Sequence, residues 1–328
     1  MKDRLDKSIH KSVLLKESID FLNIKPNGIY VDCTLGGGGH TLEIVKRLKD
    51  KGKVICFDID KESINRFDKY LVKDNWNKDK EKHFKNNVEI ILINKNFENI
   101  KEYLNQLNLM SVNGVIVDLG VSSDQLENKK RGFSYTKDGP LDMRMDLNLK
   151  VKAEDLINGL YEKELEKLFK EQDEKYAKRI AKAIIYERKK QYIDTTLHLV
   201  KIIKYAIPKV RFGRHYRSNN TDVSYYWIKP VMRVFQALRI AVNSELSSLR
   251  NMLPQALETL ASGPTSGRLV VITFHSGEDR IVKKTFKEWE NEGKVKILTK
   301  QLVRPDVDEI RNNLRARSAK LRCIEKLI

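Results

Sequence analysis

The residues best suited to chemistry in this chain are acids that follow predicted strands, set beside a glycine-rich loop. Asp32 closes an apolar run, glycines occupy positions 36–39, and His40 opens a helical pattern. A second apolar run ends at Asp58. Glycines let a backbone approach a ligand closely, and the first turn of a helix presents free N–H groups. The pattern predicts a nucleoside-cofactor pocket in which Asp58 accepts hydrogen bonds from both ribose hydroxyls.

The loop sequence narrows the choice of cofactor. A P-loop ends in Gly-Lys-Ser or Gly-Lys-Thr, whereas this loop ends Gly39-His40-Thr41, which argues against a nucleoside triphosphatase. The dinucleotide fingerprint needs a third glycine where this chain has Thr41 or Leu42, which disfavours a nicotinamide-dependent dehydrogenase. Asp32 would repel a pyrophosphate but can pair with the ammonium group of a methionine moiety. We therefore interpret the pocket as one for S-adenosylmethionine; the alternative is a strand-end cap beside a flexible turn.

Length, charge and cysteine content limit the classes of protein to which this chain can belong. The 328 residues suggest two structural units, and the 41% apolar content is enough for a buried core. The formal net charge of +18 favours a polyanionic partner such as RNA, DNA or an anionic membrane surface, unless it reflects compositional drift alone. Three cysteines without paired spacing support neither a zinc knuckle nor a disulfide framework.

Two further observations bear on location. The N-terminal residues contain no apolar leader, and no apolar run approaches the roughly 18 residues of a membrane span. We expect a cytoplasmic protein, or an organellar one if a presequence has been removed.

The chain order predicts an α/β fold with an inserted helical domain. Strand patterns alternate with helices up to about residue 120, disappear between residues 127 and 227, and resume at residues 267–274. We expect a long helix over residues 231–253 that ends at Pro254, a solvated loop over residues 73–87, and a terminal antiparallel strand pair. Expected strands cover residues 29–32, 54–58, 88–93, 114–118, 267–274, 295–298 and 321–327, and expected helices cover residues 63–71, 153–158, 162–170, 174–190 and 195–206.

Ligands of such a sheet bind beyond the carboxyl ends of its parallel strands, where Asp32, Asp58, Phe97 and Asp118 fall. Asp118 is the candidate catalytic residue, because an exocyclic base amine is a poor nucleophile and needs an acceptor for its N–H. A contact with the cofactor and a purely structural buried acid are the alternatives for this side chain.

Other polar segments are open to two interpretations. The loop over residues 131–146 suits a substrate contact or an ordered surface loop. His275 lies beside Ser276, which we expect to cap a helix, since no nucleophile-elbow motif is present. The helix over residues 174–190 carries a basic face that either touches nucleic acid or is simply solvated. The same two interpretations apply to the C-terminal cations Arg311, Arg315, Arg317, Lys320 and Arg322.

Taken together, several long motifs resemble one family over nearly the whole chain, namely the bacterial 16S ribosomal RNA cytosine-N4 methyltransferases, or MraW/RsmH family. The motifs are residues 10–15, 36–40, 118–126, 131–134, 138–146, 235–246, 274–283 and 315–318.

The resemblance implies a Rossmann-like class I sheet and methyl transfer from S-adenosylmethionine to the N4 amine of a decoding-centre cytosine, with no metal. Its substrate would be small-subunit ribosomal RNA or the assembled subunit. It implies a methyltransferase domain in two parts, residues 1–127 and 227–328, around an RNA-recognition domain over residues 128–226. The cofactor contacts that it implies are Gly38, Gly39, His40, Asp58, Phe97, Asp118 and Gln125.

The chain departs from the family pattern in three places, and two alternatives to its activity stay open. Asp124 stands where the family usually has proline, residues 73–87 are longer than expected, and the run over residues 211–227 precedes Lys229-Pro230-Val231-Met232-Arg233 in place of His-Pro-Ala-Thr-Arg. The alternatives are a DNA amino-methyltransferase and a non-catalytic RNA-binding ribosome assembly factor that retains the pocket.

Overall fold

A computed structural model describes residues 12–208 and 226–328 of the chain. The chain divides into two compact units, unit 1 with Met1–Ser122 and Leu246–Ile328, and unit 2 with Ser123–Glu245. Unit 2 therefore begins before residue 128 and continues beyond residue 226, the two bounds expected for the inserted domain. Its role in RNA recognition stays a prediction. The motif at residues 10–11 and most of the run over residues 211–227 lie outside the described residues.

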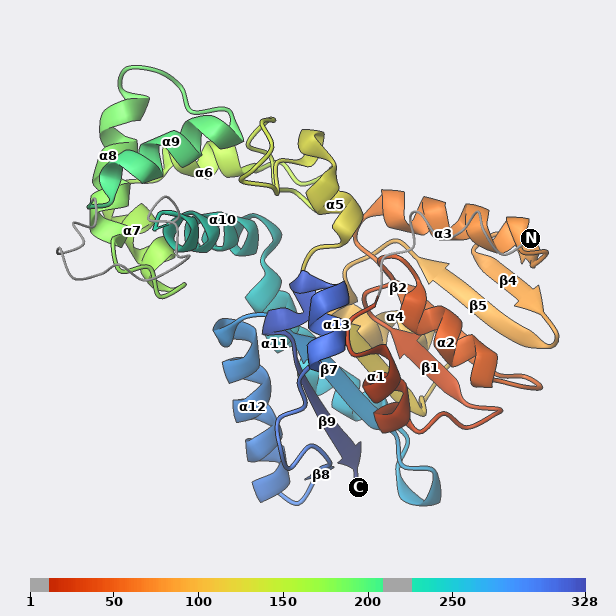
Figure 1. The fold of residues 1–328 in the computed structure, drawn as a ribbon. Helices are drawn as coiled ribbons and strands as arrows, with labels where there is room; N and C mark the ends of the chain where they lie inside the picture. Colours follow the sequence, from red (N-terminus) through yellow and green to blue (C-terminus); the bar gives the residue numbers. More distant parts are fainter. Residues whose placement is uncertain (1–11, 209–225) are drawn as a thin grey trace. The chain divides into compact units, whose positions relative to one another are not determined.

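Unit 1 is built on one mixed sheet, which confirms the predicted α/β class (Figure 1). In the described residues its strand order is β3-β4-β5-β2-β1-β6-β7-β9-β8. The five strands from β5 to β7 are parallel, and β9 runs antiparallel between β7 and β8. The predicted terminal antiparallel pair is thereby confirmed. The bounds are β1 Ile29–Asp32, β2 Lys53–Phe57, β3 Asn77–Asp79, β4 Lys82–Lys85, β5 Val88–Ile93, β6 Gly114–Asp118, β7 Arg268–Thr273, β8 Val295–Ile297 and β9 Lys320–Lys326.

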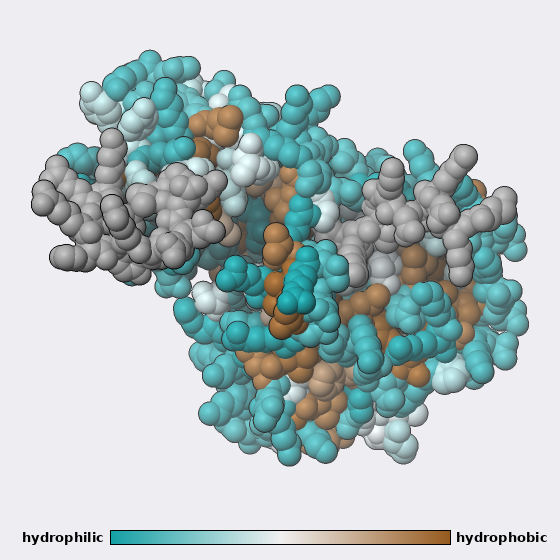
Figure 2. Space-filling view, viewed as in Figure 1, coloured by the Kyte–Doolittle hydropathy of each residue, from teal (hydrophilic) through white to brown (hydrophobic). Residues whose placement is uncertain are grey.

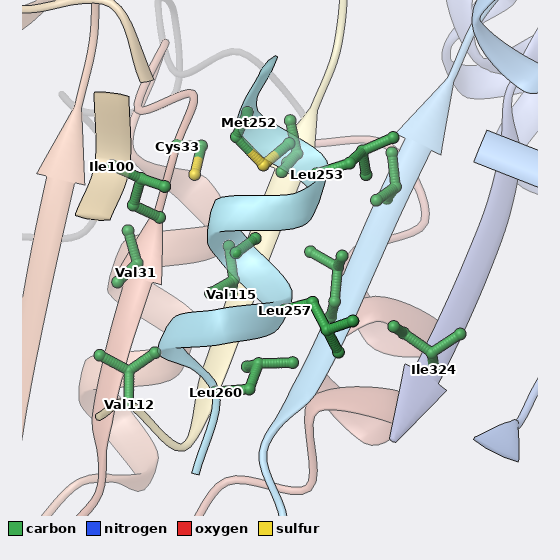
Figure 3. Packing of buried hydrophobic residues seen from close by; sticks show 14 of the residues in the cluster. Val31, Cys33, Ile100, Val112, Val115, Met252, Leu253, Leu257, Leu260 and Ile324 are labelled. Carbon is green, nitrogen blue, oxygen red and sulfur yellow. The ribbon is translucent and has the colours of Figure 1, made fainter. Parts of the chain in front are cut away.

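Helices cover both faces of this sheet because its strands are apolar on both sides. One face, with Val31 and Val115, packs against helices α4, α11 and α12 (Figure 3). The opposite face, with Tyr30 and Ile116, packs against helices α1, α2 and α3. Successive residues of one strand therefore enter separate cores. The helices are α1 Leu15–Leu22, α2 Gly39–Arg47, α3 Lys61–Lys73, α4 Ile100–Gln106, α11 Glu245–Thr259, α12 Ser276–Asn291 and α13 Val307–Asn312.

The expectation of a solvated loop over residues 73–87 is wrong. Strands β3 and β4 form a hairpin that extends the sheet beyond β5. Trp76 and His83 are buried and anchor the hairpin, and the His83 Nε2 atom lies 2.9 Å from Asp68 Oδ1. An edge hairpin tolerates polar residues on its outer side, which is why the segment has no strand-like apolar alternation.

Unit 2 is helical, as expected for this part of the chain. Its core is formed by fully buried apolar side chains from four helices, including Phe169, Ile184, Leu199 and Leu238. The helices are α5 Ser123–Glu127, α6 Ala153–Gly159, α7 Glu162–Lys170, α8 Ala177–Arg188, α9 Thr196–Ala206 and α10 Ile228–Asn243. No helix of the described ranges 12–208 and 226–328 is long and apolar enough to cross a membrane.

The loop over residues 131–146 is held from within unit 2. The buried Arg131 guanidinium donates to the carbonyl oxygens of Arg144 and Met145 at 3.0 and 2.8 Å. The Asn243 side chain accepts from the Met145 N–H and donates to the Met143 carbonyl, both at 2.7 Å. The loop is therefore well ordered, as one of its two interpretations required.

The predicted long helix over residues 231–253 is two helices. The chain leaves α10 at Ser244, whose φ of 51° is left-handed, and re-enters a helix at Glu245. Pro254 does not end the second helix but lies inside α11. The buried face of α11, with Met252, Leu253 and Leu257, packs on the sheet and stabilises the helix despite the lost backbone hydrogen bond (Figure 3).

Candidate functional site

The three candidate acids lie at the carboxyl ends of neighbouring strands of unit 1. Asp32 and Asp118 end β1 and β6, which pair in parallel, and Asp58 follows β2 on the other side of β1. Across the sheet, β2 and then β5 lie on one side of β1, and β6 and then β7 lie on its other side. This reversal of strand order marks the place where ligands bind in open α/β sheets.

The loop that follows β1 is fixed to both neighbouring strands. The N–H of Cys33 donates to Ile116 in β6 at 2.9 Å, and the N–H of Leu35 donates to Phe57 in β2 at 2.8 Å. The Thr34 hydroxyl accepts a hydrogen bond of 2.7 Å from the Asp118 N–H. The first part of the loop, residues 33–35, is thus fixed to the sheet edge.

Two glycines of this loop have backbone conformations that other residues rarely adopt. Gly36 has a φ of +50° and Gly38 a φ of +78°. A Cβ atom on Gly38 would lie 2.1 Å from the Phe67 ring, so no side chain fits there. Gly38 is the N-cap of α2, whose first turn contains Gly39 and His40. The first backbone N–H groups of α2 therefore begin directly at the loop.

Asp32 is almost completely buried and is engaged inside the fold. Its Oδ2 accepts from the Thr41 hydroxyl at 2.7 Å and its Oδ1 accepts from the Thr34 N–H at 3.1 Å. Burial raises the pKa of Asp32 to about 6, although these hydrogen bonds act in the opposite direction. The arrangement favours Asp32 as the residue that holds the loop to α2, and a direct contact with a cofactor stays a prediction.

Asp58 is arranged by the backbone around it. Its Oδ2 accepts from the Gly36 N–H and its Oδ1 from the Asp60 N–H, each at 2.8 Å. Asn94 donates to the Asp58 carbonyl at 2.9 Å and fixes the turn after β2. Burial raises the pKa of Asp58 to about 7, more than the two backbone hydrogen bonds lower it. Each carboxylate oxygen keeps a second lone pair for a ligand hydroxyl.

Asp118 combines burial with an unsatisfied oxygen. Its Oδ1 is buried and has no hydrogen-bond partner among the described residues, while its Oδ2 lies 3.8 Å from the Nδ1 of the buried His40. Burial, together with the charges of Asp32, Glu278 and Glu309, holds the pKa of Asp118 well above its usual range. A buried acceptor without a donor indicates that a ligand completes this site.

The remaining predicted cofactor residues fall in different parts of the fold. Phe97 begins the short helix η1 (Phe97–Asn99) after β5 and packs, half-buried, against the core beside α11. Next to it, Asn96 donates to the Ser248 hydroxyl of α11 at 2.9 Å. Gln125 is buried in α5 of unit 2. The structure thus brings Asp32, Gly38, Gly39, His40, Asp58 and Asp118 together at one sheet edge of unit 1.

Sequence reasoning missed two hydroxyl residues of the site, Thr34 and Thr41. A Thr two positions after Asp32 is a signal for a local side-chain turn, and a Thr in the first turn of α2 is in reach of the preceding strand end. It also assigned the wrong cap to α12. His275, not Ser276, is the N-cap, and its Nδ1 accepts from the N–H groups of Gly277 and Glu278 at 3.2 and 3.4 Å.

The C-terminal cations are partly engaged within unit 1. Lys320 and Arg322 pair with Asp279 at 3.0 and 2.7 Å, and their hydrogen bonds lower the pKa of that half-buried carboxyl although partial burial alone would raise it. Their first role is therefore to hold β9 against α12.

The structure also bears on thiol chemistry and on metal binding. Cys33, Cys56 and Cys323 are free and buried, and burial raises the pKa of each thiol. Across residues 12–208 and 226–328, no group of three or more His, Cys, Asp or Glu side chains is arranged to hold a metal ion.

Comparison with known proteins decides the family. The family model described as the MraW methylase family matches residues 7–327. The chain belongs to this family. Proteins named "Ribosomal RNA small subunit methyltransferase H" from Halothermothrix orenii and Clostridioides difficile are each 44% identical to it, with 97% of this chain and 99% of each relative covered. The protein of that name from Clostridium botulinum strain Loch Maree is 42% identical with the same coverage.

Membership of the MraW methylase family confirms the resemblance found in the sequence and the methyltransferase class of enzyme. The sheet agrees with this assignment, because the parallel strands have the Rossmann-like order that the class I methyltransferase fold requires.

Proposed function

We propose that this chain transfers a methyl group from S-adenosylmethionine to the exocyclic N4 amine of a decoding-centre cytosine in small-subunit ribosomal RNA. Membership of the MraW methylase family and the names of its relatives support the enzyme class and the RNA substrate. The observation that carries the proposal is the group of buried acids at the reversal of strand order, with the unpartnered Oδ1 of Asp118 among them.

The residues present fit S-adenosylmethionine. The donor carries a positive sulfonium and an ammonium group, and the raised pKa values of Asp32, Asp58 and Asp118 mean that a nearby cation stabilises their ionised forms. Asp32, beside the glycine loop, would repel a pyrophosphate. The donor supplies an activated methyl group, so the site needs no metal to polarise the leaving group.

Each part of the site has a proposed task in holding the donor. Asp58 accepts hydrogen bonds from the two ribose hydroxyls, since both of its oxygens keep a free lone pair beside their backbone bonds. The loop at Gly38, the N–H groups of Gly39 and His40, and the charge of Asp32 hold the methionine portion. Phe97 lies against the adenine, and Gln125 is kept as a cofactor contact that the family resemblance implies.

The acceptor side of the reaction needs a base and close alignment. The lone pair of an exocyclic amine is delocalised into the ring, so an acceptor on its N–H and a fixed approach to the methyl group are required. The unpartnered Oδ1 of Asp118 offers that acceptor when the carboxyl is ionised, a form that burial disfavours and the cationic donor stabilises. The cytosine must be unstacked, because its amine is otherwise paired.

Unit 2 is the proposed RNA-recognition domain, and the reaction is proposed to take place in the cytoplasm, where ribosomes are assembled. The formal net charge of +18 supports a polyanionic substrate. Both free ribosomal RNA and the assembled small subunit are candidates for that substrate.

The experiment offers purified protein with labelled donor to unmethylated ribosomal RNA, to small subunits and to duplex DNA. We expect N4-methylcytidine in the digested RNA by mass spectrometry, at the same rate in a chelator. RNA binding without any product would support the assembly factor, and product on DNA alone would support the DNA enzyme. The matched control is Asp58→Ala, which should abolish donor binding in calorimetry; unchanged affinity contradicts its role.

A further inference from the structure

Helix α8 of unit 2 carries a continuous row of exposed cations. The residues share one side of the helix because their spacings of three, four and seven positions match the helical repeat. We call this row the α8 basic stripe; it consists of Lys178, Arg179, Lys182 and Tyr186 in the helix and of Lys189 and Lys190 directly after its end, all exposed. The opposite side of α8, with Ala177, Ile180, Ala181 and Ile184, is buried in the helical core.

Acids neutralise only a small part of the stripe. Its Lys178 acts at a distance on Glu166 of α7, whose pKa is lowered mainly by Lys170 and to a smaller extent by Lys178. Among the described residues, Lys178, Arg179, Lys182 and Lys189 have no carboxylate within ion-pair distance, and only Lys190 pairs, with Glu187 at 3.0 Å. The neighbouring helix α7 differs, since its cations alternate with Glu162, Glu164 and Glu166 along the chain. Lys170 there lies 2.6 Å from Glu166. A solvated helix of the usual kind resembles α7, whereas α8 concentrates one sign of charge.

Tyr186 is the aromatic residue of the stripe. Its side chain is 64% exposed, although an amphipathic helix has an apolar core in which to bury such a ring. The Lys190 Nζ atom lies 4.0 Å from the ring centroid. An exposed ring flanked by cations is the arrangement with which proteins stack unpaired bases while holding the phosphates beside them.

We propose that the α8 basic stripe binds a single-stranded segment of the RNA substrate, with its cations on the phosphates and Tyr186 stacked on a base. This inference rests on the proposed RNA methyltransferase function and adds the surface that holds the RNA. From residue 178 to residue 188 the helix rises about 15 Å, which matches about four nucleotides at 3.4 Å each.

Two other partners fit the stripe less well. Insertion into a membrane surface requires an apolar face beside the cations, and the apolar face of α8 is buried. A protein interface is usually centred on apolar or aromatic anchors with charges at its rim, whereas here five cations accompany one tyrosine. Across the face shown in Figure 2 hydrophilic residues predominate, and hydrophobic residues form smaller patches between them.

The first test removes three cations without changing the helix core. The variant is Lys178→Ala/Lys182→Ala/Lys189→Ala, and the matched control is Lys163→Ala/Lys167→Ala/Lys170→Ala on α7, which loses the same charge. We expect the α8 variant to bind a ribosomal RNA fragment at least about tenfold more weakly and its salt slope to fall by about 2, because each contact to single-stranded RNA contributes about 0.7. The control should stay within about twofold of the parent.

The second test concerns the ring of Tyr186. Tyr186→Ala should weaken RNA binding about tenfold, and Tyr186→Phe should restore it, because stacking needs the ring and not the hydroxyl. A duplex RNA of the same length should compete poorly with the single strand. Circular dichroism and calorimetry with S-adenosylhomocysteine should match the parent in every variant.

The outcomes separate this inference from the proposed function. If the parent methylates RNA and the α8 variant binds and methylates it equally well, the stripe is not the RNA surface. Equal losses in the α7 and α8 variants would mean that net charge alone matters, which also overturns the inference. Binding of the parent to phosphatidylglycerol vesicles, lost in the α8 variant without loss of RNA binding, would assign the stripe to a membrane surface instead. Failure of the parent to methylate any RNA contradicts the proposed function itself.

Discussion

The carboxyl edge of the sheet in unit 1 and the α8 basic stripe in unit 2 place opposite charges in opposite environments. At the sheet edge, Asp32 is 1% exposed and burial raises its pKa to about 6. On α8 the cations are exposed to solvent. Buried charges interact strongly with a few neighbours, whereas exposed charges are weakened by salt and act through their number.

The two regions also differ in what fixes their geometry. The sheet edge depends on backbone positions, such as the left-handed Gly38 and the N–H groups that hold Asp58. The stripe depends only on helical spacing and on the core beneath α8. Single substitutions should therefore be severe at the sheet edge and mild on α8, where several must be combined.

The largest effect is expected for Asp118→Asn. Methyl transfer should fall by about a thousandfold, since a positioned proton acceptor typically contributes between about 10² and 10⁴. The thermal midpoint should not fall, because burial already disfavours the charge that the substitution removes. Affinity for S-adenosylhomocysteine then distinguishes the two roles of Asp118: retained affinity indicates the acceptor role, and lost affinity a cofactor contact. Full activity of the variant would contradict any role of Asp118 in catalysis.

Two glycine substitutions test whether the sheet edge depends on its backbone conformation more than the helices of unit 2 do. Gly38→Ala should destabilise the protein by about 2–4 kcal/mol and abolish donor binding, because its Cβ would overlap the Phe67 ring at a φ of +78°. Gly159→Ala at the end of α6 is the control, with no atom within 4 Å of the added Cβ, and should be neutral or stabilising by up to about 1 kcal/mol. Thermal unfolding checks both, and similar midpoints for the two variants would contradict the contrast.

In the parent protein, salt concentration should affect RNA binding and donor-site binding differently. If the stripe makes about four contacts to RNA phosphates, RNA affinity should fall about fiftyfold over a fourfold rise in salt. Affinity for S-adenosylhomocysteine should change by less than about twofold, since the acids that we propose to hold it are buried. Equilibrium binding in the same buffers measures both, and equal salt dependence would mean that the two sites do not differ as described.

The smallest effect is a dependence of donor affinity on pH. Asp58 has a pKa of about 7 in the fold and must be ionised to accept from the ribose hydroxyls, so affinity should rise about tenfold between about pH 6 and 8. The sign for stability is opposite: the raised pKa favours the folded protein at low pH, and that contribution is lost as the pH rises through about 7. Calorimetry in two buffers should detect proton release on binding, and its absence at pH 6 would contradict the role of Asp58.

Much of the fold could be predicted because its signals are local. Apolar runs that end in acids identify parallel strands, and their shared direction places Asp32, Asp58 and Asp118 at one edge. The helical insertion was equally visible, since α7 begins and ends where the pattern predicts.

What the sequence could not predict depends on tertiary contacts. The β3–β4 hairpin is polar, and only the burial of Trp76 and His83 explains why it is ordered. Pro254 is tolerated inside α11 because the core on the sheet compensates for a lost hydrogen bond. The hydrogen bonds of Asp32 to Thr34 and Thr41 likewise appear only once the loop closes over β1.

The division of the unit 1 sheet between two stretches of the chain has a consequence for how the protein folds. Strand β6 pairs with β7, and all of unit 2 separates them in sequence. During synthesis β6 therefore remains an unprotected edge until β7 has left the ribosome. If unit 2 folds first, its compact helices replace a long flexible loop and reduce the entropy lost when β7 joins the sheet. An insertion that we assign to substrate recognition would then also determine when the catalytic sheet can be completed.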